Sequence, residues 1–178
     1  MQSPTAVERR FQLVLIKPSH YDDDGYVIRW WRAMIPSNSL AAVYGIAADC
    51  ATRRVLGPDV VIDIEVIDET NTRIDVPAIL ARLRRHGDFG CIALVGVQSN
   101  QYPRALDIAR PFRIAGIPVA MGGFHVSGCL SMLDGRAIEL DACRDMGVAM
   151  FAGEAEGRLD EVLRDANVPR SLLPAVLA

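Results

Sequence analysis

The sequence lacks the short motifs that identify the commonest nucleotide-binding and hydrolytic sites. Its 178 residues contain no GxxxxGK[ST] phosphate loop, no GxGxxG dinucleotide fingerprint and no GxSxG nucleophile elbow. No Ser–His–Asp triad can be argued from spacing either. We therefore expect no catalysis by this chain on its own.

The four cysteines show no metal-binding spacing. Cys50, Cys91, Cys129 and Cys143 form no CxxC, CxxH or CxxxCxxC pattern. A zinc or iron–sulfur site built from local pairs is thereby excluded. We expect free thiols that are buried or half-buried, as is usual in a cytoplasmic protein.

Charge of one sign and long apolar runs are also scarce. The chain has 19 Lys+Arg against 22 Asp+Glu, a net charge of −3, and its arginines are spread along the sequence. This gives no basic footprint for nucleic acid. The longest apolar run, 40–48, is far shorter than the roughly 18 residues of a membrane span, and no signal peptide is evident. We expect a cytoplasmic protein without membrane association.

What is present is an alternation of strand and helix patterns in a chain that is 51% hydrophobic, enough for one sizeable core. Strands are predicted at 11–16, 60–68, 91–98, 117–121 and 147–152. Helices are predicted at about 37–50, 76–85, 102–115, 126–133, 139–145 and 158–167. Residues 1–10 read as an N-terminal extension, 11–167 as the domain and 168–178 as a tail or linker.

This alternation predicts an α/β fold, a doubly wound five-stranded parallel sheet of flavodoxin-like order 2-1-3-4-5 in three αβα layers. Ligands of such folds bind beyond the carboxyl ends of the strands. The unusual segments 17–36, 99–101, 122–128 and 153–157 all follow predicted strands, whereas the opposite connections are short and plain. We expect the functional chemistry at the carboxyl-end rim.

Two segments after the later strands are candidates for this rim. Gly122 and Gly123 would let backbone amides approach a bulky ligand, or would simply form a tight turn. His125 could bind an amide or phosphate, or a backbone carbonyl. Glu154 and Glu156 could act as an acid–base pair or stabilise the start of the last helix.

The long connection after the first strand leaves two questions open. Asp22, Asp23 and Asp24 follow His20, and we favour a solvated turn over a cation site because three consecutive carboxylates rarely converge on one ion. Tyr26, Trp30 and Trp31 could wall a flat ligand, face a partner domain or anchor the loop on the core.

Four segments in this order resemble the cobalamin-binding domain at the N-terminus of one class of radical-SAM enzymes, over about 11–167. They are PSHYDDDGY at 18–26, IPSNSLA at 35–41, GGFH at 122–125 and GEAE at 153–156. The resemblance implies corrinoid contacts from Ser19, His20, Tyr26, Ser37, Asn38, Gln98, Ser99, Asn100, Gly122, Gly123, Phe124, His125, Gly153 and Glu154. It also implies small residues where the nucleotide tail enters, here Gly122, Gly123, Ser127 and Gly128.

The resemblance further implies base-off cobalamin without a histidine ligand to cobalt. The DxHxxG motif of other corrinoid-binding proteins is broken around His20, which has Pro18 and Asp23 at the positions of the motif's Asp and Gly. His20 stays a minor alternative as a cobalt ligand. Because CxxxCxxC is absent, the iron–sulfur cluster and S-adenosylmethionine would belong to a radical-SAM partner domain, in cis or in trans.

Two other hypotheses stay open. A flavodoxin-like or nucleotide-binding domain would place a flavin or nucleotide at the same rim, although the phosphate fingerprints are missing. A ligand-free interaction module of the receiver type is disfavoured because Gln98-Ser99 stands where an aspartate would be needed.

Overall fold

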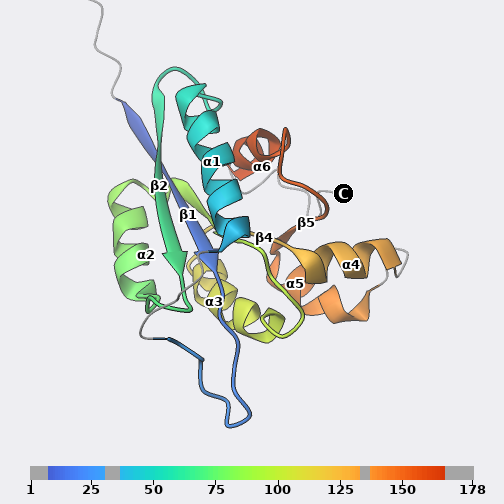
Figure 1. The fold of residues 1–178 in the computed structure, drawn as a ribbon. Helices are drawn as coiled ribbons and strands as arrows, with labels where there is room; N and C mark the ends of the chain where they lie inside the picture. Colours follow the sequence, from blue (N-terminus) through green and yellow to red (C-terminus); the bar gives the residue numbers. More distant parts are fainter. Residues whose placement is uncertain (1–7, 31–36, 133–136, 167–178) are drawn as a thin grey trace, which may run out of the picture.

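The computed structural model describes residues 8–30, 37–132 and 137–166, which form a three-layer αβα domain (Figure 1). The strands are β1 Arg9–Lys17, β2 Val60–Asp68, β3 Gly90–Leu94, β4 Val119–Gly122 and β5 Ala149–Phe151. The helices are α1 Asn38–Thr52, α2 Val76–Arg85, α3 Tyr102–Ile114, α4 Phe124–Met132, α5 Asp141–Met146 and α6 Leu159–Ala166, with a 3₁₀ turn at Ile138–Leu140.

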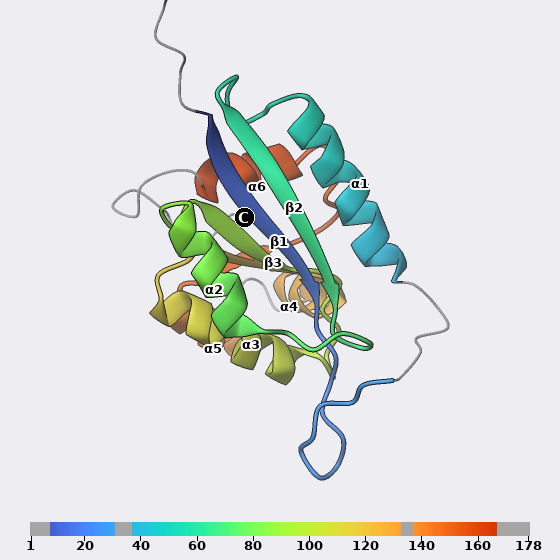
Figure 2. The same cartoon turned by 90° about the vertical axis from the view of Figure 1, so that its left-hand side faces the viewer.

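All five strands are parallel, in the order β2-β1-β3-β4-β5. This confirms the predicted fold class and strand order. Helices α1 and α6 cover one face of the sheet, and α2, α3 and α5 cover the other (Figure 2). Helix α4 begins directly at the carboxyl end of β4.

The predicted helix starts are also confirmed at α1 and α2. The Ser37 hydroxyl accepts a hydrogen bond from the Leu40 amide at 3.2 Å, and the Asp75 carboxylate accepts one from the Ala78 amide at 3.0 Å. Such side-chain caps satisfy amides that have no partner within the helix.

The third strand is shorter than predicted. We expected it to run from 91 to 98, but β3 ends at Leu94. The apolar run continues because Val95 and Val97 are buried outside the strand, and the Val97 amide donates to the Gly122 carbonyl. Gly96 between them has φ +67°, a left-handed conformation that ends the extended strand.

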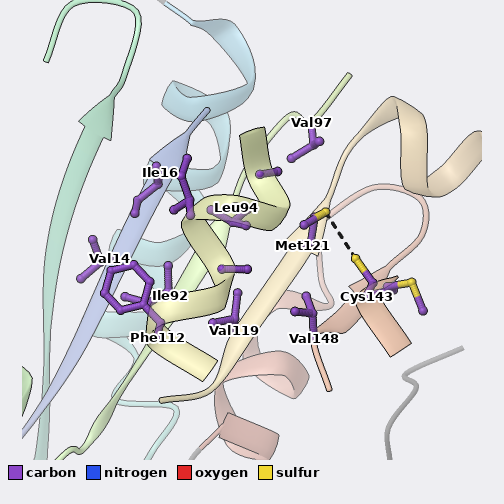
Figure 3. Packing of buried hydrophobic residues seen from close by; sticks show 14 of the residues in the cluster. Val14, Ile16, Ile92, Leu94, Val97, Phe112, Val119, Met121, Cys143 and Val148 are labelled. Atoms are coloured by element: carbon purple, nitrogen blue, oxygen red, sulfur yellow. Dashed lines mark hydrogen bonds between the residues drawn. The ribbon is translucent and has the colours of Figure 1, made fainter. Parts of the chain in front are cut away.

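Side chains of the strands alternate between two hydrophobic cores. Val14, Ile92, Val119 and Met121 pack toward α2, α3 and α5, together with the fully buried Phe112 of α3 (Figure 3). Their neighbours in the strands belong to the second core, beneath α1 and α6. The cavity described below lies in this second core.

Strand β1 begins at Arg9, two residues inside the predicted extension 1–10. The predicted tail 168–178 lies outside the described residues. Trp31 and residues 35–36 of the IPSNSLA segment also lie outside them. None of the helices within the described ranges combines the length and apolar character required to cross a bilayer.

Candidate functional site

A cavity of about 450 Å³ opens at the carboxyl-end rim and lies between the sheet and the helices α1 and α6. Its inner wall includes Ala93 of β3, Ala120 of β4, Ile46 of α1 and Val162 of α6. The volume lies within the range of small-molecule pockets, which are mostly apolar with a few polar groups.

The cavity exists because the two neighbouring strands β3 and β4 carry small side chains on one face only. Beneath α1 and α6 these strands present Cys91, Ala93 and Ala120. On the opposite face they present Ile92, Leu94, Val119 and Met121. A sheet with methyl-sized side chains on one face leaves space that α1 and α6 do not fill.

The Gly-Gly turn forms the lip of the cavity, and Gly122, Gly123 and Phe124 all line it. Gly123 has φ +142° and packs directly on the backbone of residues 96–97. Gly122 differs, because a Cβ there would meet only ordinary contacts with Phe151 at 3.4–3.7 Å. The glycine requirement at 123 is thus imposed by the fold itself.

The GEAE segment forms the opposite lip, where residues 153–156 line the cavity. The Gly153 amide donates to the Ser127 hydroxyl at 3.1 Å, which ties this turn to helix α4. Arg158 donates to the Ala152 carbonyl at 3.1 Å, and its guanidinium lies 4.8 Å from the centre of the Phe151 ring. The two lips are therefore held together across the mouth.

The charge at the mouth is negative. Glu154 and Glu156 line the cavity, whereas no lysine, arginine or histidine from the described part of the chain does so. Carboxylates at the mouth repel phosphate-rich ligands and tolerate neutral or cationic ones.

The structure brings together six of the fourteen predicted site residues. Gln98, Gly122, Gly123, Phe124, Gly153 and Glu154 all line the cavity. Ser127, predicted where a ligand tail would enter, lines it as well, whereas Gly128 does not. Sequence reasoning missed the residues of the inner wall. The alternation of small and large side chains in β3 and β4 was the signal that could have found them.

The other eight predicted residues lie elsewhere on or near the rim, and none is part of the cavity lining. Ser37 caps α1, and Asn38 and Asn100 are exposed. Tyr26 is 72% exposed, and the His20 carbonyl accepts a hydrogen bond from the Ile28 amide.

Ser99 and His125 contact each other instead of the cavity. The His125 Nδ1 lies 3.2 Å from the Ser99 hydroxyl oxygen, and the imidazole packs on the Tyr102 ring with 4.3 Å between ring centroids. Burial lowers the pKa of His125 below its ordinary value, with an opposing contribution from Glu139.

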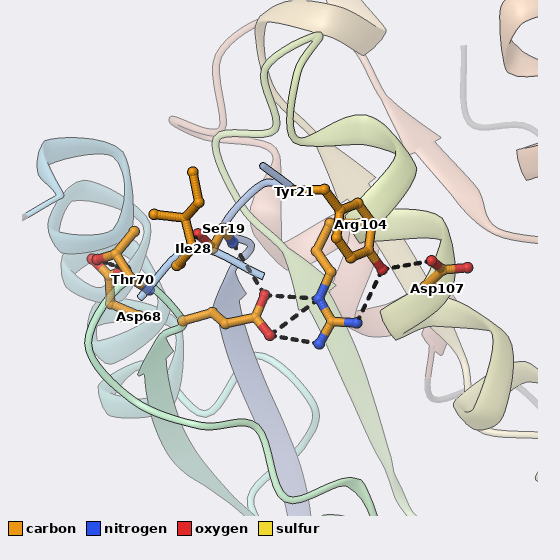
Figure 4. A network of polar contacts seen from close by, with 8 residues as sticks. Ser19, Tyr21, Ile28, Asp68, Thr70, Arg104 and Asp107 are labelled. Carbon is orange, nitrogen blue, oxygen red and sulfur yellow. Dashed lines mark hydrogen bonds and ion pairs between the residues drawn. The ribbon is translucent and has the colours of Figure 1, made fainter. Parts of the chain in front are cut away.

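Ser19 has a structural role in a buried polar network that sequence reasoning missed. Its amide donates to the Glu69 carboxylate at 3.1 Å and its hydroxyl donates to the Ile28 carbonyl. Arg104 of α3 donates to Glu69 through Nη2 at 2.6 Å, and it also contacts the Tyr21 hydroxyl (Figure 4). This network anchors the loop after β1 to α3, beside the rim.

No group of three or more His, Cys, Asp or Glu side chains in 8–30, 37–132 and 137–166 is arranged to hold a metal ion. The acidic cluster 22–24 agrees with the solvated turn that we favoured, because Asp22 accepts hydrogen bonds from the amides of Asp24 and Tyr26.

Comparison of the chain with protein-family models, curated proteins and solved structures gives no significant match.

Proposed function

We propose that the protein binds cobalamin, with the macrocycle on the carboxyl-end rim and the nucleotide tail in the cavity between the sheet and α1 and α6. The observation that carries this proposal is the cavity itself, which leads from the glycine lip at 122–123 inward to Ala93 and Ala120. A flat macrocycle with a narrow side arm needs this combination of an open rim and a slot lined by small residues.

The chemistry of the lining supports a largely uncharged ligand. The inner wall is formed by alanine, valine, isoleucine and leucine side chains, which suit an apolar heterocycle at the end of the tail. The single phosphate of the tail requires little positive charge, and backbone amides near the start of α4 can bind it.

The same lining argues against the flavin or nucleotide alternative. Glu154 and Glu156 at the mouth would repel the dianionic phosphate of FMN or the triphosphate of ATP more strongly than the singly charged phosphodiester of a corrinoid tail. The chain also lacks their glycine-rich phosphate motifs.

The proposal includes base-off cobalt without a histidine ligand, because the DxHxxG motif is broken around His20, which has Pro18 and Asp23 at the positions of the motif's Asp and Gly. When bound, cobalamin would supply a cobalt centre that carries a methyl group or assists radical chemistry. The residues of this chain would bind the corrinoid, orient it and shield its tail from water.

The remaining chemistry would belong to a radical-SAM partner domain, in cis or in trans, because the chain has no CxxxCxxC motif. We also propose a cytoplasmic location. The four cysteines support it, because all of them are free thiols.

The direct test is to incubate the full chain with hydroxocobalamin, remove free ligand by gel filtration and record the absorption spectrum. We expect corrinoid absorbance to elute with the protein, with the spectrum of the base-off form. Loss of all corrinoid from the protein fraction would contradict the proposal. Retention with a nitrogen-ligated spectrum would contradict the base-off assignment alone.

The same experiment with FMN and ATP separates the alternatives. Retention of FMN or ATP in place of corrinoid would favour the hypothesis of a flavin- or nucleotide-binding domain. A ligand present at a hundredfold excess over its dissociation constant should also stabilise the fold by about 2.7 kcal/mol, which thermal unfolding detects.

A further inference from the structure

Three side chains on the α3 side of the rim form a chain of contacts that the cavity does not use. The two ring nitrogens of His125 face different partners. Nδ1 lies 3.2 Å from the Ser99 hydroxyl oxygen, and Nε2 lies 3.9 Å from the Cys129 sulfur. A thiol beside an imidazole that a third group orients is the general arrangement of an activated nucleophile.

The fold holds this arrangement in place. His125 and Cys129 are four residues apart on α4, so their side chains share one face of the helix. The His125 amide donates to the Val97 carbonyl at 3.1 Å, and the ring packs on Tyr102. The imidazole is thus fixed both at its backbone and at its ring.

Cys129 also differs from the other cysteines in accessibility. Cys50, Cys91 and Cys143 are buried, whereas Cys129 is half-buried. Part of Cys129 is therefore exposed to solvent, where a small reagent can approach it.

The protonation states fit a proton transfer from sulfur to nitrogen. Burial lowers the pKa of His125, against a smaller opposing effect of Glu139, so the imidazole is unprotonated at neutral pH. Burial, together with Glu139, raises the pKa of the Cys129 thiol, so this thiol keeps its proton. Tyr102 stays neutral in this range, because burial raises its pKa as well. A protonated thiol that touches a neutral imidazole can react if the imidazole accepts its proton.

We propose that Cys129 is a modification site for hydroperoxides, with His125 Nε2 as the base that accepts the thiol proton and Ser99 as the residue that positions the imidazole. In this arrangement Nδ1–H donates to the Ser99 oxygen and leaves the Nε2 lone pair toward sulfur.

The reaction with hydrogen peroxide balances as follows. The sulfur attacks one peroxide oxygen, an S–O bond forms and the O–O bond breaks. The thiol proton moves to His125 Nε2 and then to the departing hydroxide, which leaves as water. Sulfur is oxidised by two electrons to a sulfenic acid, and peroxide is reduced.

The test measures the rate of sulfenic acid formation at Cys129 in the full chain. Hydrogen peroxide is added in the presence of dimedone, and the labelled peptide is quantified by mass spectrometry over pH 6–9. For the wild type we expect a rate constant that levels off above the lowered pKa of His125. A thiol without a base would instead react about tenfold faster with each pH unit, because only its thiolate reacts.

Two variants and one control separate the roles. His125→Gln removes the base, and we expect a loss of about tenfold or more at pH 7 together with the steep pH profile. Ser99→Ala removes only the positioning hydroxyl, and we expect a loss of about threefold or more with an unchanged pH profile. Ser131→Ala removes a hydroxyl that donates to the Gly128 carbonyl on the same helix, and we expect no change.

The proposal is overturned if the wild-type rate rises tenfold per pH unit, or if both His125→Gln and Ser99→Ala react as fast as the wild type. Circular dichroism checks that each variant is folded. If His125→Gln does not fold, the wild-type pH profile and the rate of Ser99→Ala still test the proposal, because both leave the His125 ring packed on Tyr102. The outcome is independent of whether cobalamin binds.

Discussion

Gly123 lies directly against the backbone of Val97, so closely that a Cβ on residue 123 would overlap the Val97 amide nitrogen and approach the Gly96 carbonyl carbon to 2.7 Å. This contact joins the turn after β4 to the segment that follows β3. It fixes the two sides of the rim from which the cavity opens.

Gly123→Ala should therefore destabilise the protein strongly. The left-handed backbone costs about 1–2 kcal/mol with a side chain, and forcing a methyl group into a packed contact adds about 1–3 kcal/mol. We expect the free energy of unfolding to fall by about 2–5 kcal/mol in urea titrations.

Gly128→Ala is the matched control for this contact. Gly128 lies inside α4, and nothing stands within 4 Å of its added Cβ. Because alanine favours helix over glycine, we expect stabilisation by about 0.5–1 kcal/mol. Equal effects of the two substitutions would contradict the close contact at Val97.

A second pair of substitutions tests the cavity as the corrinoid site. Ala42 and Ala41 are adjacent exposed alanines of α1, but only Ala42 lines the cavity. Ala42→Phe should fill part of the space and lower hydroxocobalamin affinity by about tenfold or more, a loss of about 1.4 kcal/mol. Ala41→Phe should leave the affinity unchanged.

Spectrophotometric titration with hydroxocobalamin measures both affinities. If both variants bind like the wild type, the corrinoid tail does not occupy this cavity. Unfolding midpoints of the two variants show that the difference arises in binding and not in stability.

The ion pair between Arg104 and Glu69 should contribute much more to the stability of the fold than the exposed ion pairs near it. The Glu69 side chain is 2% exposed, and Arg104 supplies its charged partner. Arg104→Met would leave a buried carboxylate without that partner, a loss that we expect to cost about 3 kcal/mol in urea unfolding.

Arg110→Met on the same helix provides the comparison. Its ion pair with Asp107 is solvent-exposed, at 60% and 43%, so removing it should change stability by about 0.5 kcal/mol or less. If both variants lost the same free energy of unfolding, the burial of Glu69 would not determine how much its ion pair stabilises the fold.

Stability should fall at alkaline pH because of Cys91. Burial raises the pKa of this thiol from 9.0 to about 12, so above pH 9 the unfolded chain releases a proton that the folded chain retains. The stabilisation is complete below pH 9 and is lost as the pH rises toward 12, at up to about 1.4 kcal/mol per pH unit.

Urea unfolding at several pH values from 8 to 11 measures this slope in the wild type and in Cys91→Ala. The variant is less stable at every pH because it loses packing. Its free energy of unfolding should nevertheless fall less steeply with pH, by about 1.4 kcal/mol per pH unit, which corresponds to one proton. Tyr102, whose pKa is also raised by burial, contributes equally to both proteins above pH 10. Parallel curves would contradict the role of Cys91.

The sequence by itself determined the architecture. Apolar runs of strand length between amphipathic helical segments predicted the parallel order 2-1-3-4-5, and strand 60–68 and helix 76–85 were predicted with the bounds that the structure has. These features follow from local periodicity, capping by Ser37 and Asp75, and the short connections that parallel strands require. The placement of Gln98, Gly122 and Glu154 on one rim follows from that topology.

Only the tertiary structure decided which of those rim residues face a cavity and which face each other. His125 and Phe124 are neighbours in sequence, yet Phe124 lines the cavity while His125 turns to Ser99 and Cys129. Adjacent residues on a helix point about 100° apart, and which one meets an open space depends on the packing of distant segments. The cavity itself arises between Ala93, Ala120 and Ile46, which are far apart in the sequence and are brought together by the crossover connections of the sheet.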